Sequence, residues 1–252
     1  MKQFNKNAES YDAVRKKITY PDGLYRSLST RVPSNKAALD IGCGNGVSTV
    51  PLKTYFADVQ GCDLGDALIE RACHHYPDIT FSVSPAETFS PSRNYDLVTS
   101  ATSFYWMDRK VILMNLKNWL KSDGVFCAYK YDFPLVYGPL RDFIEQELVT
   151  RWANYRDPRL TQYDNTLELM RDCQHLYNAQ REVFANIIFL SAEEIALFFL
   201  STSYVTRYIE QEGGEFYYRE FMEKIVMIGG VEPIAVNFDI HAFTAVNNAV
   251  NR

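Results

Sequence analysis

Several features of membrane, secreted and nucleic-acid-binding proteins are missing from this sequence of 252 residues. Its longest apolar stretches, 184–190 and 195–200, are much shorter than the ~18 residues that a membrane-spanning helix needs. The opening residues 1–12 contain no apolar core of a signal peptide. The formal net charge is −5 and the basic cluster at 15–17 is short, so the charge pattern of a nucleic-acid-binding protein is absent. We therefore expect a cytoplasmic protein that binds neither membranes nor nucleic acids.

Cysteine and histidine are also sparse. The sequence has five cysteines and four histidines, with no C-x-x-C pair and no cysteine and histidine at the spacing of metal ligands. We expect no metal site, no catalytic histidine, and cysteines that serve as small buried apolar residues in a reducing compartment.

The sequence does contain a glycine-rich run, DIGCGNG, from Asp40 to Gly46. It follows the short apolar stretch 37–39 and precedes a segment, 47–56, that is typical of a helix. Glycine tolerates positive φ and has no Cβ, so this loop can turn sharply and approach a ligand closely. The N–H groups of the following helix would point to the same place. The arrangement suits an adenosine cofactor with a carboxylate or phosphate end.

The spacing of the glycines separates two cofactor classes. A dinucleotide-binding loop has the pattern G-x-G-x-x-G, whose third glycine would fall on Val47. This mismatch weakens the interpretation as a nicotinamide-dependent oxidoreductase, which stays the alternative from another enzyme class. The pattern D-x-G-x-G-x-G instead resembles motif I of class I S-adenosylmethionine-dependent methyltransferases. The resemblance implies that Asp40, Gly42, Gly44 and Gly46 bind S-adenosyl-L-methionine, that the product is S-adenosyl-L-homocysteine, and that no metal is needed.

Later segments agree with an adenosine cofactor. The apolar run 59–62 ends in Asp63, about 20 residues beyond the loop, where an acidic residue accepts hydrogen bonds from ribose hydroxyls. A simple turn residue is the alternative role of Asp63. The family's adenine-contacting turn, and the rule that ligands bind at the carboxyl ends of parallel strands, predict further cofactor contacts at Leu64, Ala86, Glu87, Ser100 and Ala101.

The order of the expected elements predicts the fold. Strands and helices alternate from 37 to 131, which is typical of a doubly wound α/β sheet. The resemblance implies a mostly parallel, seven-stranded, Rossmann-like methyltransferase sheet in a single domain, 1–252. Within it we expect a cofactor-binding core at 37–131, a helical insertion at 134–180 that caps the substrate, and an N-terminal lid at 1–30. We further expect a helix that Gly124 ends, single strands at 183–190 and 234–246, and a capped helix at 191–200.

A narrower resemblance lies outside the cofactor core. The stretch YWMD at 105–108 is similar to the His-Trp-Phe-Asp stretch of the trans-aconitate methyltransferase-like branch of small-molecule enzymes, with Tyr105 in place of His. The stretch LSTS at 200–203 looks like that branch's Leu-x-Thr-x-Ser helix, and Tyr11, Arg15 and Tyr20 look like its N-terminal signature. The resemblance implies a small-molecule acceptor.

The cofactor's activated methyl group decides the chemistry that we expect. The protein has to align a nucleophile with the S–CH₃ bond, and no His or Asp stands at the matched positions to act as a base. A carboxylate is ionised at neutral pH and needs no base. We therefore expect O-methylation of a small carboxylic acid by a monomer or homodimer; methylation of nitrogen, carbon or a phenol is the alternative. The candidate catalytic residues are Tyr20, Tyr105 and Trp106, and those for the substrate are these three with Arg15, Lys130, Tyr131 and Ser203.

Overall fold

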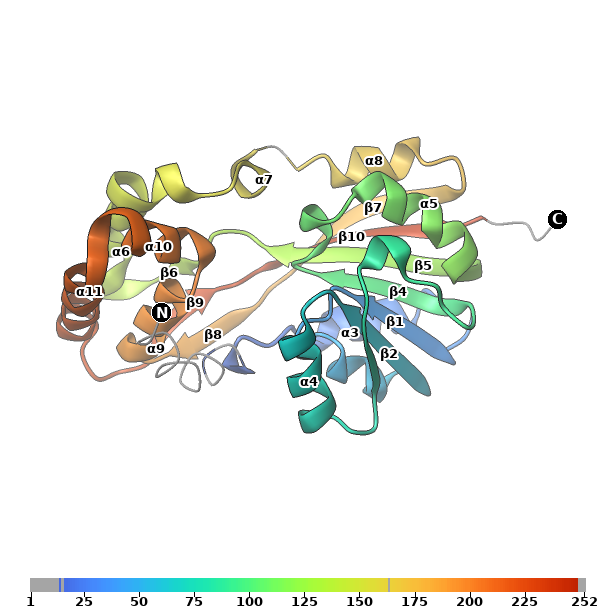
Figure 1. The fold of residues 1–252 in the computed structure, drawn as a ribbon, viewed down its shortest axis with the longest axis horizontal. Helices are drawn as coiled ribbons and strands as arrows, with labels where there is room; N and C mark the ends of the chain where they lie inside the picture. Colours follow the sequence, from blue (N-terminus) through green and yellow to red (C-terminus); the bar gives the residue numbers. More distant parts are fainter. Residues whose placement is uncertain (1–13, 15, 163, 249–252) are drawn as a thin grey trace. The chain divides into compact units, whose positions relative to one another are not determined.

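The computed structural model describes residue 14, residues 16–162 and residues 164–248 (Figure 1). The chain divides into two compact units. The sheet unit consists of residues 20–131, 163–184 and 240–252, and the helical unit consists of residues 1–19, 132–162 and 185–239. Each unit is therefore assembled from segments that are distant in the sequence.

The sheet unit contains a seven-stranded sheet in the order β3-β2-β1-β4-β5-β10-β7. The first five strands of this order pair in parallel, whereas β10 runs antiparallel to both β5 and β7. The expected doubly wound, mostly parallel seven-stranded sheet is thereby confirmed. The strands are β1 (Ala37–Ile41), β2 (Asp58–Asp63), β3 (Thr80–Val83), β4 (Tyr95–Ala101), β5 (Leu120–Tyr131), β7 (Leu176–Phe184) and β10 (Ile240–Asn247).

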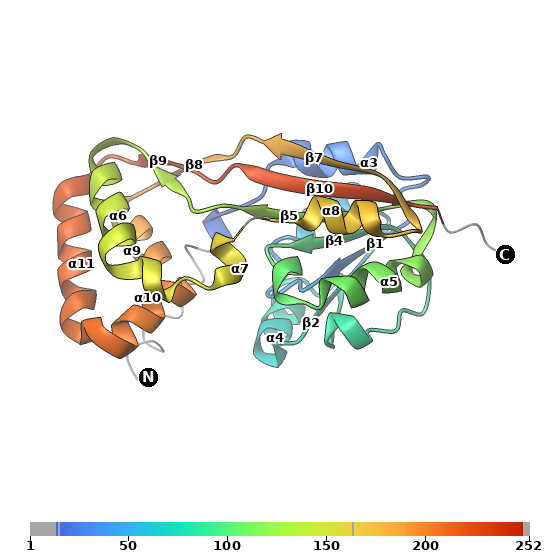
Figure 2. The ribbon, with the colours of Figure 1, turned by 90° about the horizontal axis from the view of Figure 1, so that it is seen from above.

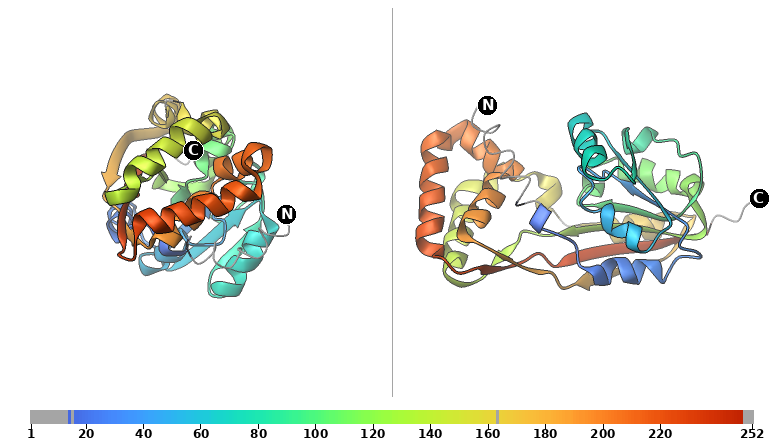
Figure 3. Two further views of the ribbon diagram at one scale, coloured as in Figure 1. Left: turned by 90° about the vertical axis from the view of Figure 1, so that its left-hand side faces the viewer. Right: turned by 90° about the horizontal axis from the view of Figure 1, so that it is seen from below.

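Helices cover both faces of this sheet, so its central strands β1 and β4 are buried along their whole length. All of β1 is buried; its Leu39 and Ile41 pack on the face covered by α5 (Arg109–Trp119) and α8 (Thr166–Asp172). Ala38 faces the opposite side, where α3 (Asp22–Ser29) packs (Figure 2; Figure 3, right panel). The other helices of this unit are α4 (Asp66–His75) and the 3-10 turns η1 (Val50–Thr54), η2 (Ala86–Thr88) and η3 (Phe104–Trp106).

The helical unit combines a small sheet, in the order β6-β9-β8, with a layer of helices (Figure 3, left panel). Aromatic side chains fill its core: Trp152 is fully buried and stacks on Phe199, with ring centroids 5.4 Å apart. The Trp152 Nε1 donates to the hydroxyl of Tyr217 at 2.9 Å. The elements are β6 (Leu135–Val136), β8 (Ile187–Leu190), β9 (Ile234–Asn237), α6 (Arg141–Glu147), α7 (Pro158–Thr161), α9 (Ala192–Leu200), α10 (Ser203–Tyr208), α11 (Gly214–Gly229) and the short turns η4 (Gly138–Leu140), η5 (Leu148–Trp152), η6 (Ala153–Tyr155) and η7 (Ile209–Gly213).

Two expected helix boundaries were wrong. After the glycine loop the chain forms turns and the 3-10 helix η1 rather than a helix over 47–56. Pro51 lies in the first turn of η1, where its missing N–H costs no hydrogen bond. Gly124 does not end a helix: α5 ends at Trp119, and Gly124 lies inside β5. A Cβ at Gly124 would come 3.1 Å from the carbonyl oxygen of Tyr95, so glycine permits close approach of the backbones there.

Two segments that were expected to be single strands are divided between the two sheets. The segment 183–190 is split between β7 and β8, and the segment 234–246 between β9 and β10. Polar side chains end the ladder at the second break: the backbone N–H of Asp239 donates to the side chain of Asn237 at 2.6 Å, and the carboxylate of Asp239 accepts from the N–H of Asn186 at 2.9 Å. The capped helix at 191–200 is confirmed by the capping box of Ser191 and Glu194.

The boundaries of the two units differ from those of the expected core, 37–131, and the expected insertion, 134–180. The chain returns to the sheet unit at residue 163, and the helical unit takes in 185–239 as well. The helix α8 lies within the expected insertion 134–180 but belongs to the sheet unit. The role of the insertion 134–180 as a substrate cap stays a prediction, as does the lid at 1–30, most of whose first half lies outside the described residues.

The buried carboxylate of Asp96 links the amino end of β4 to neighbouring segments through hydrogen bonds. Asp96 has no exposed surface and accepts hydrogen bonds from Lys121 Nζ at 2.8 Å, Ser34 Oγ at 2.6 Å and the N–H of Ala37 at 2.9 Å. Burial alone would raise the pKa of this carboxyl, but the hydrogen bonds from Lys121 and Ser34 outweigh it and lower the pKa. The ionised carboxylate thus stabilises the fold.

Replacing Asp96 with Ala is expected to lower the free energy of unfolding by about 2 to 4 kcal/mol, because it leaves the partners of a buried charge unpaired. The contribution is present above the unfolded carboxyl pKa of about 4 and is lost as pH falls through the lowered folded value. Denaturant unfolding at pH 7 and pH 3 measures both effects. The control is Asp58→Ala, at an exposed ion pair with Arg93, with an expected loss of about 1 kcal/mol or less. Equal losses in the two variants would contradict this account.

Candidate functional site

The glycine loop lies at the carboxyl end of β1 and its three glycines all have positive φ: 67° at Gly42, 53° at Gly44 and 87° at Gly46. At Gly42 an added Cβ would lie 2.5 Å from the Cβ of Ser103, so this glycine permits the turn after β4 to pack on the loop. At Gly44 an added Cβ would meet no atom within 4 Å. Gly44 therefore presents bare backbone to open space, which is what close approach of a ligand requires.

Asp40 is buried in the sheet unit and supports the glycine loop through hydrogen bonds. It is fully buried, and its carboxylate accepts hydrogen bonds from Ser48 Oγ at 2.6 Å, Thr49 Oγ1 at 2.8 Å and Thr99 Oγ1 at 2.7 Å. Burial raises the pKa of Asp40, and the hydrogen bonds from the three hydroxyls oppose that effect. Asp40 therefore positions the loop, and the direct cofactor contact that was expected of it stays a prediction.

Asp63 ends β2 beside the glycine loop. Its Oδ2 accepts from the N–H of Gly44 at 2.9 Å, and its Oδ1 accepts from the N–H of Gly65 at 2.8 Å. The carboxylate is partly exposed, and each oxygen of an ionised carboxylate can accept more than one hydrogen bond. Asp63 thus joins the two turns and retains acceptor capacity toward solvent, as a residue that binds hydroxyl groups must.

The residues that were expected to contact adenine differ in how they are placed. Leu64 is 71% exposed, so its side chain is available to a ligand, whereas Ala86 is buried. The carboxylate of Glu87 accepts from the N–H of Asp108 at 2.9 Å, next to the start of α5. Glu87 therefore fixes the position of α5, and its contact with a cofactor stays a prediction.

Backbone strain marks the turn that follows β4. Thr102 has φ of 51°, a left-handed conformation that is costly for a residue other than glycine, and its N–H donates to the carbonyl of Tyr129 at 2.7 Å. Ser100 is fully buried and donates to the carbonyl of Ile41 at 3.1 Å, and Ala101 is also buried. Strain of this kind collects at functional sites. The strained turn belongs to the same edge as the glycine loop, while Ser100 and Ala101 point their side chains into the core.

A cluster of tyrosines adjoins this turn. The Tyr20 and Tyr129 rings meet edge to face with centroids 5.1 Å apart, and the hydroxyls of Tyr25 and Tyr129 are 3.4 Å apart. Burial raises the pKa values of Tyr20, Tyr25 and Tyr129 above their ordinary value, with Tyr131 adding to the rise at Tyr20 and a hydrogen bond with Thr102 opposing it. These phenols are neutral at physiological pH and act as hydrogen-bonding groups rather than bases.

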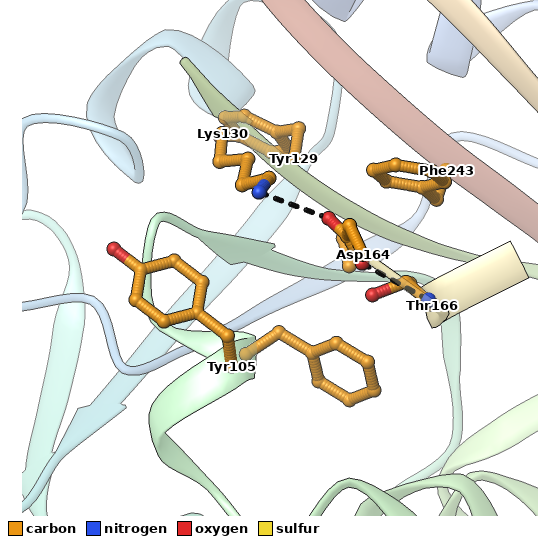
Figure 4. Close-up of a pocket in the computed structure, with 8 residues that line it drawn as sticks. Tyr105, Tyr129, Lys130, Asp164, Thr166 and Phe243 are labelled. Carbon is orange, nitrogen blue, oxygen red and sulfur yellow. Dashed lines mark hydrogen bonds and ion pairs between the residues drawn. The ribbon is translucent and has the colours of Figure 1, made fainter. Parts of the chain in front are cut away.

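A pocket adjoins the opposite face of β5 (Figure 4). Lys130 Nζ lies 3.0 Å from Asp164 Oδ2 and 5.9 Å from the centroid of the Tyr105 ring. Burial alone would raise the pKa of Asp164, but hydrogen bonds from Thr166 and Lys130 outweigh it and lower the pKa. Tyr105 also interacts electrostatically with Tyr20 of the tyrosine cluster. The pocket is lined by Phe104, Tyr105, Ala128, Tyr129, Lys130, Asp164, Thr166 and Phe243.

The structure gathers some of the expected acceptor residues in the sheet unit. Tyr20, Tyr105, Lys130 and Tyr131 are partly buried there, and Trp106, 39% exposed, lies against Tyr105 with ring centroids 5.0 Å apart. Their roles stay predictions. The remaining two are placed differently: Ser203 is an exposed residue at the start of α10 in the helical unit, and Arg15 lies outside the described residues together with Tyr11.

Sequence reasoning missed Thr102, Tyr129 and Asp164. The strain at Thr102 has no sequence signal, because threonine is not a residue that favours positive φ. Asp164 precedes Asn165 and Thr166, a pattern that indicates the start of a helix. That pattern does not reveal the ion pair with Lys130, 34 positions earlier in the chain.

Two features are absent from the described residues. Within them, no group of three or more His, Cys, Asp or Glu side chains is placed to hold a metal ion. No helix in the described part of the chain has the length and apolar character needed to cross a bilayer.

Comparisons with known proteins agree with this geometry. Residues 38–124 match the model of a methyltransferase domain family. The chain is 30% identical over 145 residues to CRG1 of Saccharomyces cerevisiae, named as a probable S-adenosylmethionine-dependent methyltransferase, covering 52% of this chain and 50% of that protein. It is 32% identical over 110 residues to trans-aconitate 2-methyltransferase of Methylobacterium radiotolerans, covering 42% of each. The chain thus spans about half the length of the curated relatives that it matches.

Solved structures share the fold. A protein of Anaeromyxobacter dehalogenans assigned as a type II methyltransferase superposes with a TM-score of 0.72 at 23% identity, covering 90% of this chain and 96% of that one. The YcgJ protein of Bacillus subtilis superposes with a TM-score of 0.56 at 17% identity, covering 90% and 97%. With the domain match, these likenesses establish the Rossmann-like methyltransferase fold.

The first prediction from this site concerns Gly44. Gly44→Ala is expected to weaken the binding of S-adenosylhomocysteine by about tenfold or more, because the added methyl group occupies the open space beside the backbone. The left-handed backbone also costs about 1 to 2 kcal/mol of stability. Gly138→Ala is a matched control, since Gly138 has φ of 69° and the same open surroundings but lies in the helical unit. Titration calorimetry that finds equal affinity in both variants would exclude Gly44 from the cofactor site.

The second prediction concerns Asp63. Asp63→Ala is expected to weaken S-adenosylhomocysteine binding by about 1.5 to 3 kcal/mol, the range for a hydrogen bond to a charged group. The control, Asp58→Ala, removes a carboxylate from the other end of β2 and should leave the affinity unchanged. Calorimetry and a melting curve on each variant separate binding from stability. Unaltered affinity in Asp63→Ala would show that Asp63 does not bind the cofactor and only connects the two turns.

Proposed function

We propose that this chain, which contains a class I S-adenosylmethionine-dependent methyltransferase domain, transfers a methyl group from S-adenosylmethionine to a carboxylate oxygen of a small molecule. One observation carries the choice of acceptor: the tyrosines beside the glycine loop have raised pKa values, and the residues lining the adjoining pocket include no histidine. A nucleophile that has to lose a proton would find no suitable base there.

The residues present fit the cofactor. The open backbone at Gly44 and the partly exposed carboxylate of Asp63 would hold its amino-acid and ribose parts, and the exposed side chain of Leu64 would cover its adenine. When bound, S-adenosylmethionine supplies a methyl group that its sulfonium has already activated. The task left to the protein is to hold the acceptor in line and to exclude water, for which proximity and orientation supply about 7 to 11 kcal/mol.

The aromatic residues would perform that task. The rings of Tyr20, Tyr105 and Trp106 offer π faces that attract a cationic sulfonium and surfaces that exclude water. The hydroxyls of Tyr20 and Tyr131 can donate hydrogen bonds to a carboxylate. A carboxylate needs no deprotonation at neutral pH, so this set of groups is sufficient for it.

The ionisable side chains of Asp164 and His241 support the same conclusion. Asp164 has a lowered pKa and already binds Lys130, which makes it a weak base. His241 pairs with Lys130 in the register of β10 and β5, but its Nδ1 contacts Arg181 at 2.5 Å and it is not among the pocket-lining residues.

Trans-aconitate 2-methyltransferases among the relatives, at 30 to 32% identity, also favour an acid as the methyl acceptor.

An amine is the second candidate acceptor. The Asp164 carboxylate, which lies in the same pocket, would attract an ammonium group. One relative, at 25% identity, is named as an N,N-dimethyltransferase of an amino sugar nucleotide. Methylation of carbon or of a phenol would require a base and is not favoured. The cytoplasmic location, the absence of nucleic-acid partners and the monomeric or dimeric state stay predictions.

The test supplies methyl-labelled S-adenosylmethionine with trans-aconitate, cinnamate, cinnamylamine and p-cresol. We expect label in a methyl ester, released as methanol by mild alkali, with turnover that is flat above the acceptor's carboxyl pKa of about 4 to 5. Label that survives alkali on nitrogen or on a phenolic oxygen would overturn the choice of a carboxylate.

Two variants sharpen this test. Tyr20→Phe is expected to lower turnover while leaving the shape of the pH profile unchanged, because the hydroxyl that it removes is neutral throughout the physiological range. His241→Ala should likewise leave the profile unchanged. A rising limb in the wild-type pH profile that disappears in His241→Ala would identify that histidine as a general base.

A further inference from the structure

The ion pair of Lys130 and Asp164 is placed unusually for a pair that only stabilises the fold. Its side chains are 17% and 24% exposed, and it borders a pocket instead of lying on the open surface. Apolar groups of Phe104, Ala128 and Phe243 line the same pocket. Because these groups exclude water, the charges attract each other, and any charged ligand, more strongly than surface charges do.

The two partners are held with different rigidity. Asp164 also accepts a hydrogen bond from the N–H of Thr166 at 3.0 Å, so the backbone fixes its carboxylate independently of Lys130 (Figure 4). Lys130 extends from β5 on a flexible four-carbon stem, and its ammonium lies 5.9 Å from the centroid of the Tyr105 ring. A carboxylate that enters the pocket can therefore draw the ammonium away from Asp164 while Asp164 stays in place.

We propose that Asp164 is an internal competitor of the acceptor, an aspartate that occupies Lys130 until a substrate carboxylate displaces it, and so sets which acids bind. This inference rests on the proposed function. An acid with weak additional contacts cannot displace Asp164, whereas an acid whose apolar part packs against the aromatic side chains at the pocket can. Asp164 is thus a specificity-determining residue: it weakens the binding of all anions and thereby selects those that also match the pocket walls.

The experiment measures the dissociation constants of benzoate, cinnamate and trans-aconitate by calorimetry in the presence of S-adenosylhomocysteine. Asp164→Asn keeps an acceptor for the N–H of Thr166 but removes the competing charge. It is expected to bind these anions more tightly by about tenfold, a factor that corresponds to about 1.4 kcal/mol. The gain should be lost in Asp164→Asn combined with Lys130→Met, because the cation that the anions bind is then gone.

Two controls separate this effect from a general change of charge or stability. Asp58→Asn removes an equal charge at the exposed pair with Arg93 and should leave anion affinity unchanged. Cinnamylamine, the amine counterpart of cinnamate, should gain nothing from Asp164→Asn. Melting curves show whether each variant is folded under the conditions of the titration.

The outcomes distinguish this inference from the proposed function. Lys130 is expected to bind anions more tightly once the charge of Asp164 is removed. Anion binding that is unchanged, weakened or undetectable in folded Asp164→Asn therefore overturns the inference. If Asp164→Asn binds the acids more tightly but no enzyme form yields a methyl ester, the inference stands and the proposed acceptor is wrong.

Discussion

The carboxylate of Asp40 is the group on which the rest of the site depends. It is fully buried beneath the glycine loop, and the hydroxyls of Ser48, Thr49 and Thr99 donate to it. Two of these donors follow the loop and the third belongs to β4, so one buried charge ties the loop to the neighbouring strand. Burial of a charged group destabilises the folded state unless hydrogen bonds compensate for the lost water. The loop conformation that exposes Gly44 is therefore fixed by the packing of the sheet, before any ligand binds.

The electrostatics of the edge favour a nucleophile that carries its own charge. Burial raises the pKa values of Tyr20, Tyr25 and Tyr129 and keeps them neutral. Hydrogen bonds from Thr166 and Lys130 lower the pKa of Asp164, which makes this carboxylate a poor base. Such a surface can orient and dehydrate an acceptor but cannot deprotonate it. An ionised carboxylate needs no deprotonation, which is why the proposed reaction follows from the site as a whole rather than from a single catalytic side chain.

The sequence predicted the sheet and the glycine loop because both depend on local signals, namely apolar strand runs and glycines that need positive φ. It did not predict where segments change unit. The breaks near Asn186 and Asp239 depend on hydrogen bonds between residues 53 positions apart, and the apolar pattern continues through them. The substrate side was predicted less well for the same reason: Asp164 meets Lys130 through the fold, and Thr102 is strained by the turn after β4. The hydrogen bonds of Asp40 to Ser48, Thr49 and Thr99 were not predicted, because a motif indicates which residues are present but not which of them the packing buries.

The most direct test of the account is a crystal structure of the protein with S-adenosylhomocysteine. We expect its homocysteine part to lie against the backbone of Gly44 and its ribose hydroxyls to donate to Asp63, with Asp40 still buried and bound by Ser48, Thr49 and Thr99. Binding of the molecule elsewhere, or at this edge without a contact to Gly44 and Asp63, would contradict the assignment of the glycine loop on which the proposed function depends.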